Sequence, residues 1–203
     1  MSSSSLPRRS LLLGAGLVMA APQMVLAQGA KPRVRMMTSL GPITIELEDK
    51  RAPLTSANFL RYVDAKAYDG GSFFRAARND WAPTQGTIVA QPPAKSRPFA
   101  PIRHESTTMT GLSHVHGAIS LGRFAPGTAT NTFFICLGDQ TFLDAQPGEP
   151  GDNLGYAVFG KVVSGLSNAQ KILAQPTGGE TKFVEQKDQW LKKPVIIETA
   201  RRA

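Results

Sequence analysis

Glycine and proline divide this chain into short segments, and that division is the strongest constraint on its fold. The 203 residues include 19 glycines and 15 prolines. Residues 43–48 (Ile-Thr-Ile-Glu-Leu-Glu) alternate apolar and polar side chains, which is the pattern of a half-buried strand. Residues 34–38 precede them across a Gly-Pro turn, so the two segments predict an antiparallel hairpin. Further strands are predicted over residues 72–76, 117–121, 132–137, 156–163 and 194–199.

Only two segments have the spacing of a helix. Residues 53–65 begin with Pro53, which suits the first turn of a helix, and residues 167–174 form a second, shorter helical pattern. Many short strands and few helices predict an all-β barrel or sandwich with helical caps. The length of the chain favours one domain.

Residues 78–101 do not fit a regular element, because they contain five prolines at positions 83, 92, 93, 98 and 101. Proline lacks the N–H group that a helix interior or a central strand requires. We therefore expect a long loop here, and long loops inside compact domains are usually functional or disordered.

The N-terminal residues 1–27 have the pattern of a secretory signal peptide. Arg8 and Arg9 precede an apolar run over residues 11–21, which is too short to span a membrane. Small or modest residues then predict cleavage near Ala27. The paired arginines favour a twin-arginine signal, with an ordinary secretory signal as the alternative.

This pattern predicts the location and the domain limits of the protein. We expect export to the periplasm or beyond, with no stable membrane insertion once the signal is removed. Residues 28–32 are expected to form a linker, and residues 33–203 a single folded domain.

A formal net charge of +8 raises the question of a nucleic-acid partner. No nucleic-acid-binding motif accompanies the basic residues, which are dispersed, and we expect a solvated basic surface with no nucleic-acid partner. The dispersed residues are Arg33, Arg35, Arg51, Arg61, Arg75, Arg78, Lys192, Lys193, Arg201 and Arg202.

Several familiar catalytic motifs are absent from the sequence. It contains no G-x-S-x-G elbow, no Walker loop and no H-E-x-x-H pair. His114 and His116 would share one face of a strand, but no third metal ligand follows at a clear spacing. We expect a surface histidine pair, with a metal site as the weaker alternative. Cys136 lies in an apolar run and is expected to be an inert core residue.

Several strings resemble those of one family, in the same order along the chain. Residues 52–59 (Ala-Pro-Leu-Thr-Ser-Ala-Asn-Phe) and 68–75 (Tyr-Asp-Gly-Gly-Ser-Phe-Phe-Arg) resemble the first helix and the catalytic-arginine strand of cyclophilins. Residues 131–135, 142–144 and 155–163 resemble later cyclophilin blocks. The last block resembles the bacterial exported branch, and the resemblance covers about residues 33–200.

The resemblance implies a closed eight-stranded antiparallel β-barrel capped by two α-helices. It also implies peptidyl-prolyl cis–trans isomerase activity on proline-containing polypeptides, without a cofactor or metal, and we expect a monomer. Arg75 matches the catalytic arginine, whose guanidinium is always charged and offers a rigid fork of donors. Phe134 matches the floor of the proline slot, and Phe142 and Leu143 match its wall. Tyr156 matches a substrate-binding position at which many eukaryotic members carry histidine and the bacterial branch usually carries tyrosine.

The chain departs from the family pattern beside these residues. Gln91 is the best match for the glutamine that binds the substrate backbone, but Ile88 and Val89 replace an aromatic residue and a methionine. Thr132 stands where a glutamine is expected, and Gly122-Arg123 replaces an alanine–asparagine contact site. A weak or inactive proline-peptide-binding or chaperone module on the same barrel is therefore the alternative function.

Overall fold

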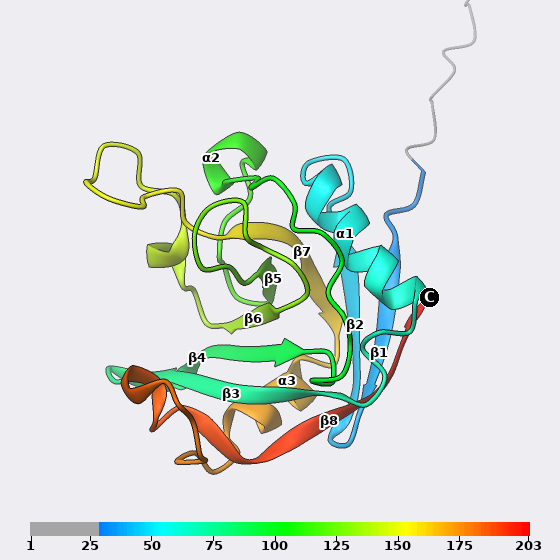
Figure 1. The fold of residues 1–203 in the computed structure, drawn as a ribbon, viewed down its shortest axis with the longest axis vertical. Coiled ribbons are helices and arrows are strands. Elements are labelled where there is room, and N and C mark those ends of the chain that lie inside the picture. The colour runs from blue at the N-terminus through cyan, green and yellow to red at the C-terminus, as the bar shows by residue number, and fades with distance from the viewer. Residues whose placement is uncertain (1–28) are drawn as a thin grey trace, which may run out of the picture. The chain divides into compact units, whose positions relative to one another are not determined.

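Strands dominate the fold, and they close into a barrel (Figure 1). The computed structural model describes residues 29–203, so the predicted signal peptide lies outside the described residues. Residues Lys31–Ala203 form one compact unit. Within it, eight antiparallel strands follow the order β1-β2-β7-β5-β6-β4-β3-β8. They are β1 (Arg33–Thr38), β2 (Gly41–Leu47), β3 (Gly71–Asn79), β4 (Ala82–Gln91), β5 (Ala118–Leu121), β6 (Phe133–Leu137), β7 (Ala157–Ser164) and β8 (Trp190–Arg202).

Two helices pack against the barrel wall. Helix α1 (Pro53–Asp64) contacts β7 and β8, and helix α3 (Leu166–Leu173) contacts β2, β3 and β4. A single turn, α2 (Thr107–Thr110), and the 3₁₀ turns η1 (Thr141–Leu143) and η2 (Val184–Gln186) lie in the connections. The predicted all-β barrel with two capping helices is confirmed. Within residues 29–203, no helix is both long enough and apolar enough to cross a membrane.

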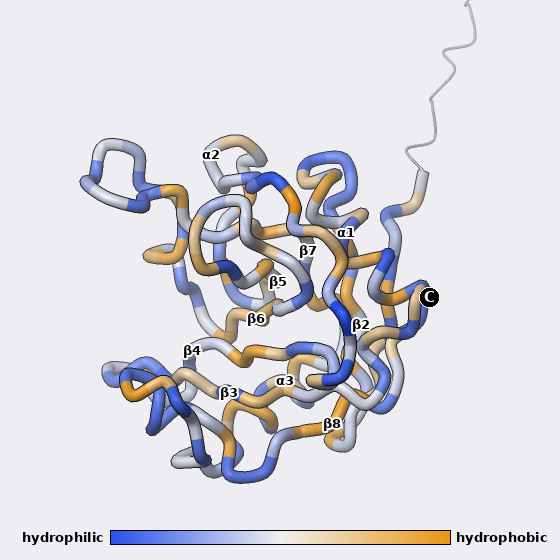
Figure 2. Tube along the Cα trace, in the orientation of Figure 1, coloured by the Kyte–Doolittle hydropathy of each residue, from blue (hydrophilic) through white to orange (hydrophobic). Residues whose placement is uncertain are grey.

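The predicted N-terminal hairpin forms as β1 and β2, which pair from Arg33 opposite Glu46 to Thr38 opposite Gly41. The alternating apolar residues of β2 are fully buried and point into the barrel. Figure 2 shows how apolar and polar residues are distributed over the molecule. Apolar residues recur along β3, β6 and β8, while the loop between η1 and β7 is hydrophilic.

The segment with five prolines contains a strand, so the prediction of a loop over residues 78–101 was wrong for residues 82–91, and also for residues 78–79, which end β3. Strand β4 lies between β3 and β6 in the barrel. Its ladder with β6 runs only from Gly86 to Ala90 and contains no proline. Pro83 lies in β4 before that ladder, where the pairing with β3 is irregular, and the next two prolines follow the strand, so no proline interrupts the ladder with β6.

An aromatic cluster joins α1 to the barrel. The Phe59 ring of α1 lies 5.2–5.5 Å, centroid to centroid, from the rings of Tyr68, Phe133 and Phe159. All four side chains are fully buried. Tilted and edge-on ring pairs of this kind add to the free energy gained from apolar burial.

This packing predicts a large effect of truncation at the cluster. Replacing Phe59 by alanine removes a ring that the neighbours cannot fill, and should lower the free energy of unfolding by about 3–5 kcal/mol. Urea unfolding measures this loss. The matched control Phe124→Ala, whose side chain is 86% exposed, should change it by less than about 0.5 kcal/mol. Equal effects of the two substitutions would contradict this account of the core.

Candidate active site

The strands β4 and β6 present different residues to the two faces of the barrel wall. Phe133 and Ile88 belong to the main core, whereas their neighbours Phe134 and Val89 belong to a second, smaller apolar cluster. Successive side chains of a strand point to opposite faces, so one set fills the barrel and the other lies outside it. The second cluster forms the base of a cleft of about 610 Å³.

The base of the cleft is apolar and nearly closed to solvent. Phe134 is 6% exposed, and its ring meets that of Tyr156 edge-on at a centroid distance of 5.3 Å. Leu143 and Val89 complete the apolar lining. A small apolar ring such as that of proline has the size and polarity to pack against an aromatic floor of this kind.

Arg75 brings a positive charge to this apolar cleft. Its side chain is half-buried, and its Nε–H donates a hydrogen bond to Oε1 of Gln189 at 2.7 Å. Burial lowers the pKa of Arg75 below its usual value, with Tyr156 acting in the opposite direction. Arginine nevertheless stays charged in proteins. Among residues 29–203, no carboxylate forms an ion pair with Arg75, and none lines the cleft.

The structure brings most of the predicted site residues into this one cleft. They are Arg75, Val89, Gln91, Gly122, Thr132, Phe134, Leu143 and Tyr156. Two predicted residues lie elsewhere. Ile88 is fully buried in the barrel core, because it alternates with Val89 along β4. Phe142 is 54% exposed and lines a neighbouring hollow, where its ring lies 6.4 Å from that of Trp81.

Gln91 lines the cleft but does not hold Arg75. In the β3–β4 register, Gln91 stands opposite Ser72, whereas Arg75 stands opposite Val89. Among the described residues, the side-chain hydrogen bond of Arg75 goes to Gln189 instead. Gln91 and Arg75 therefore line the same cleft without standing opposite each other in this ladder.

Arg123 is fixed against the loop between η1 and β7. Its Nη1 and Nη2 atoms bind the carboxylate of Asp152 at 2.5 and 2.8 Å, and its Nε donates to the carbonyl of Gly155 at 2.9 Å. Its guanidinium also lies over the ring of Tyr156, 5.4 Å from the centroid. The ion pair lowers the pKa of Asp152. Arg123 thus supports one wall of the cleft.

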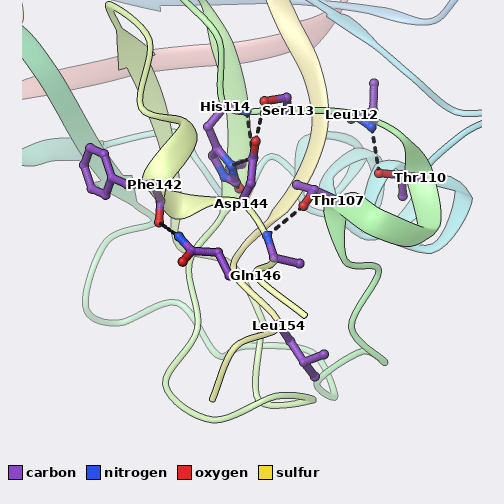
Figure 3. A network of polar contacts seen from close by, with 12 residues as sticks. Thr107, Thr110, Leu112, Ser113, His114, Phe142, Asp144, Gln146 and Leu154 are labelled. Atoms are coloured by element: carbon purple, nitrogen blue, oxygen red, sulfur yellow. Dashed lines mark hydrogen bonds and ion pairs between the residues drawn. The ribbon is translucent and has the colours of Figure 1, made fainter. Parts of the chain in front are cut away.

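A polar network around His114 packs against the floor residue Phe134. Figure 3 shows the hydrogen bonds of this network. His114 Nδ1 contacts Asp144 Oδ1 at 2.5 Å, and the His114 backbone N–H donates to the same oxygen at 3.0 Å. The Ser113 hydroxyl donates to the other carboxylate oxygen. On the far side of the ring, His114 Nε2 contacts Ser120 Oγ at 2.9 Å. The imidazole stacks on the Phe134 ring, with the two centroids 5.7 Å apart and an angle of 8° between the ring planes. The network therefore supports the floor of the cleft.

The prediction of a surface histidine pair was therefore wrong for His114, which is fully buried, although His116 is exposed. The two residues precede β5 rather than alternating within a strand. Within residues 29–203, no group of three or more His, Cys, Asp or Glu side chains could hold a metal ion. Cys136 is buried in the same apolar cluster, where burial raises the pKa of its thiol to about 12, so it remains protonated as an inert core residue.

One wall of the cleft was missed by sequence reasoning. Phe183, Gln186 and Trp190 line it: the first two come from the segment that joins α3 to β8, and Trp190 begins β8. The Trp190 ring lies 4.8 Å from that of Phe74 and 6.3 Å from that of Phe183. The only local signal was a string of aromatic residues and glutamines around one of the two tryptophans of the chain.

Comparison with known proteins places the chain in a family. Residues 33–202 match the profile described as cyclophilin type peptidyl-prolyl cis-trans isomerase/CLD. The chain belongs to the cyclophilin family. It is 35% identical to a peptidyl-prolyl cis-trans isomerase of Acinetobacter baylyi, over 85% of each chain. It is 32% identical to peptidyl-prolyl cis-trans isomerase A of Dickeya dadantii, over 83% of each chain.

Solved cyclophilin structures share the fold. A cyclophilin type isomerase of Cryptosporidium parvum matches with a TM-score of 0.65 at 19% identity, over 85% of this chain and 98% of that one. The structure of that protein in the presence of the dipeptide Ala-Pro matches with a TM-score of 0.62 at 18% identity, over 84% and 98% of the two chains. At such identities the likeness establishes the barrel only.

The buried histidine predicts how the stability of this cyclophilin depends on pH. Burial lowers the pKa of His114 in the folded state, although Asp144 opposes the shift. An unfolded chain binds this proton near pH 6.5, whereas the folded chain binds it only at lower pH. The contribution of neutral His114 to the free energy of unfolding is therefore complete above about pH 6.5. It is lost as the pH falls from there toward the pKa of His114 in the folded state.

Urea unfolding between pH 7.5 and pH 5.5 checks this prediction. The wild-type free energy of unfolding should fall over that interval of about 2 pH units, and the fall should be smaller in His114→Gln. The control His116→Gln changes an exposed histidine and should keep the wild-type slope. A wild-type slope in His114→Gln would show that another group causes it.

Proposed function

We propose that this chain is a monomeric peptidyl-prolyl cis–trans isomerase that acts on X-Pro bonds of exported proteins as they fold. Family membership supports the reaction type, since the relatives named above are peptidyl-prolyl isomerases. One observation carries the mechanism. The Arg75 guanidinium, which no carboxylate of the described residues neutralises, lines the same cleft as the apolar floor at Phe134.

The obstacle to the reaction is amide resonance. Rotation about a peptide bond has a barrier of about 18–20 kcal/mol, because the bond is partly double. In the twisted transition state the prolyl nitrogen becomes pyramidal and regains its lone pair. A guanidinium N–H of Arg75 aimed at that nitrogen binds the twisted state better than the planar one. Such differential binding is what lowers the barrier.

The apolar residues of the cleft hold the proline ring in place for this step. Phe134 forms the floor, while Leu143, Tyr156 and Val89 provide apolar surface beside it. Exclusion of water from this surface strengthens the hydrogen bond from Arg75, because electrostatic interactions grow as the local dielectric constant falls.

The polar residues of the cleft suit the substrate backbone. Gln91 and Thr132 offer hydrogen-bonding side chains on the lining. The Gly122 N–H already donates to the Thr132 carbonyl at 2.7 Å, so the backbone contact that Gly122 offers is through its own carbonyl oxygen. These groups would fix the peptide on either side of the proline while the ring rotates relative to the preceding residue.

Substitution of Arg75 tests the proposed mechanism. In a protease-coupled assay with a proline tetrapeptide, Arg75→Ala should lower kcat/KM by about 100-fold, as expected for loss of one transition-state donor. Arg75→Lys keeps the charge but not the planar fork, and should recover only part of the activity. Arg35→Ala, at an exposed position of β1, is the control and should match the wild type. Equal rates for Arg75→Ala and the wild type would contradict the mechanism.

The place of action rests on residues 1–27, whose paired arginines and short apolar run are typical of a twin-arginine signal. The double substitution Arg8→Lys, Arg9→Lys should leave the protein in the cytoplasm of a bacterium that secretes the wild-type chain. Cell fractionation and immunoblotting measure this distribution. Unchanged export of the double variant would indicate the ordinary secretory route, and retention of the wild-type chain would contradict export.

A further inference from the structure

Gln189 lies beside Arg75, although the two residues are 114 positions apart in the sequence. The Gln189 side-chain oxygen accepts the Nε–H of Arg75 at 2.7 Å. Both side chains are half-buried, and Arg75 lines the cleft together with Gln186 and Trp190, which flank Gln189 in the sequence. Because Nε is occupied in this way, the plane of the guanidinium is defined by a contact outside the apolar slot.

The backbone of Gln189 is tied to the strand that carries Arg75. Its carbonyl accepts the backbone N–H of Ala76 at 2.8 Å, and its own N–H donates to the carbonyl of Gln186 at 2.9 Å. The following residue, Trp190, stands opposite Arg75 in the β3–β8 register. Gln189 is therefore held by its backbone next to Trp190, the residue that pairs with Arg75. This anchoring fixes the position of the Gln189 side-chain oxygen.

An amide is a different partner from a carboxylate at this position. Other arginines of the fold bind carboxylates, as Arg123 does with Asp152 and Arg201 with Asp69. A carboxylate would compensate the guanidinium charge and compete for its remaining N–H groups. The neutral oxygen of Gln189 orients the group through one hydrogen bond and leaves the charge uncompensated.

We propose that Gln189 is a positioning residue for Arg75, which fixes the guanidinium plane so that its Nη groups face the cleft. This inference rests on the proposed isomerase function and assigns part of that machinery to the segment between α3 and β8. It gives Arg75 an orienting partner other than Gln91, which stands opposite Ser72.

The decisive variant is Gln189→Leu, which puts a branched apolar side chain, one bond shorter, in place of the amide and so removes the acceptor. In the proline-peptide assay, kcat should fall by about 10-fold while KM changes by less than about twofold, because the lost interaction orients a transition-state donor. The control Gln175→Leu removes a glutamine whose side chain bonds the Lys171 carbonyl at the end of α3, outside the cleft, and should leave both constants unchanged.

A spectroscopic readout tests the contact without relying on activity. In ¹H–¹⁵N spectra, the Nε–H of Arg75, assigned through its loss in Arg75→Lys, should give a resolved signal because it is hydrogen-bonded. Gln189→Leu should lose this signal to solvent exchange while the backbone spectrum is otherwise retained. Gln189→Glu should keep the signal yet lower kcat, because the carboxylate compensates the charge.

The outcomes separate the two proposals. If the wild type is active, and Gln189→Leu keeps both the wild-type kcat and the Nε–H signal of Arg75, the positioning role is overturned. Full activity of Gln189→Glu would overturn the requirement for a neutral acceptor. An inactive wild type in which the Nε–H signal still depends on Gln189 would overturn the isomerase function, while the structural contact would stand.

Discussion

Alternation of side chains across the barrel wall is the constraint on which the site depends. Along β6, Phe133 points into the core and meets Phe59 of α1, while Phe134 points outward and forms the floor of the cleft. Along β4, Ile88 and Val89 divide in the same way. Each of these strands contributes side chains both to the barrel core and to the cleft. The core packing that stabilises the barrel therefore also fixes the position of the apolar floor. A shift of one residue in register would exchange the two faces.

The cleft combines this rigid apolar floor with a charge held at its edge. Burial of Arg75 disfavours the charged form, and its orienting partner is the neutral amide of Gln189. A charged donor without a carboxylate partner is suited to a reaction in which an electron pair appears on nitrogen only in the transition state. Below the floor, the His114 ring stacks on Phe134 and is itself held by Asp144, so both the floor and Arg75 are supported by groups outside the slot.

Local sequence patterns predicted most of the fold, because strand and helix periods are local properties. The β1–β2 hairpin, α1 and the buried run at β6 were predicted to within about two residues of their ends. Strand β4 was missed because the number of prolines in the segment does not show that they lie outside the β4–β6 ladder. His114 was expected at the surface because its partner Asp144 is 30 residues away. Gln189 lies in a segment without a matching family motif, and only the closed barrel brings it to Arg75.

The central claim is that this cleft catalyses rotation about X-Pro bonds, and exchange spectroscopy measures that rotation directly. Uncatalysed isomerisation takes tens to hundreds of seconds, so a free proline peptide gives separate cis and trans signals without exchange peaks. The account predicts that a catalytic amount of residues 28–203 produces cis–trans exchange peaks, and that Arg75→Ala does not. Shifts of the Phe134 and Tyr156 signals on peptide addition, without exchange peaks, would instead identify a proline-peptide-binding module and contradict the account.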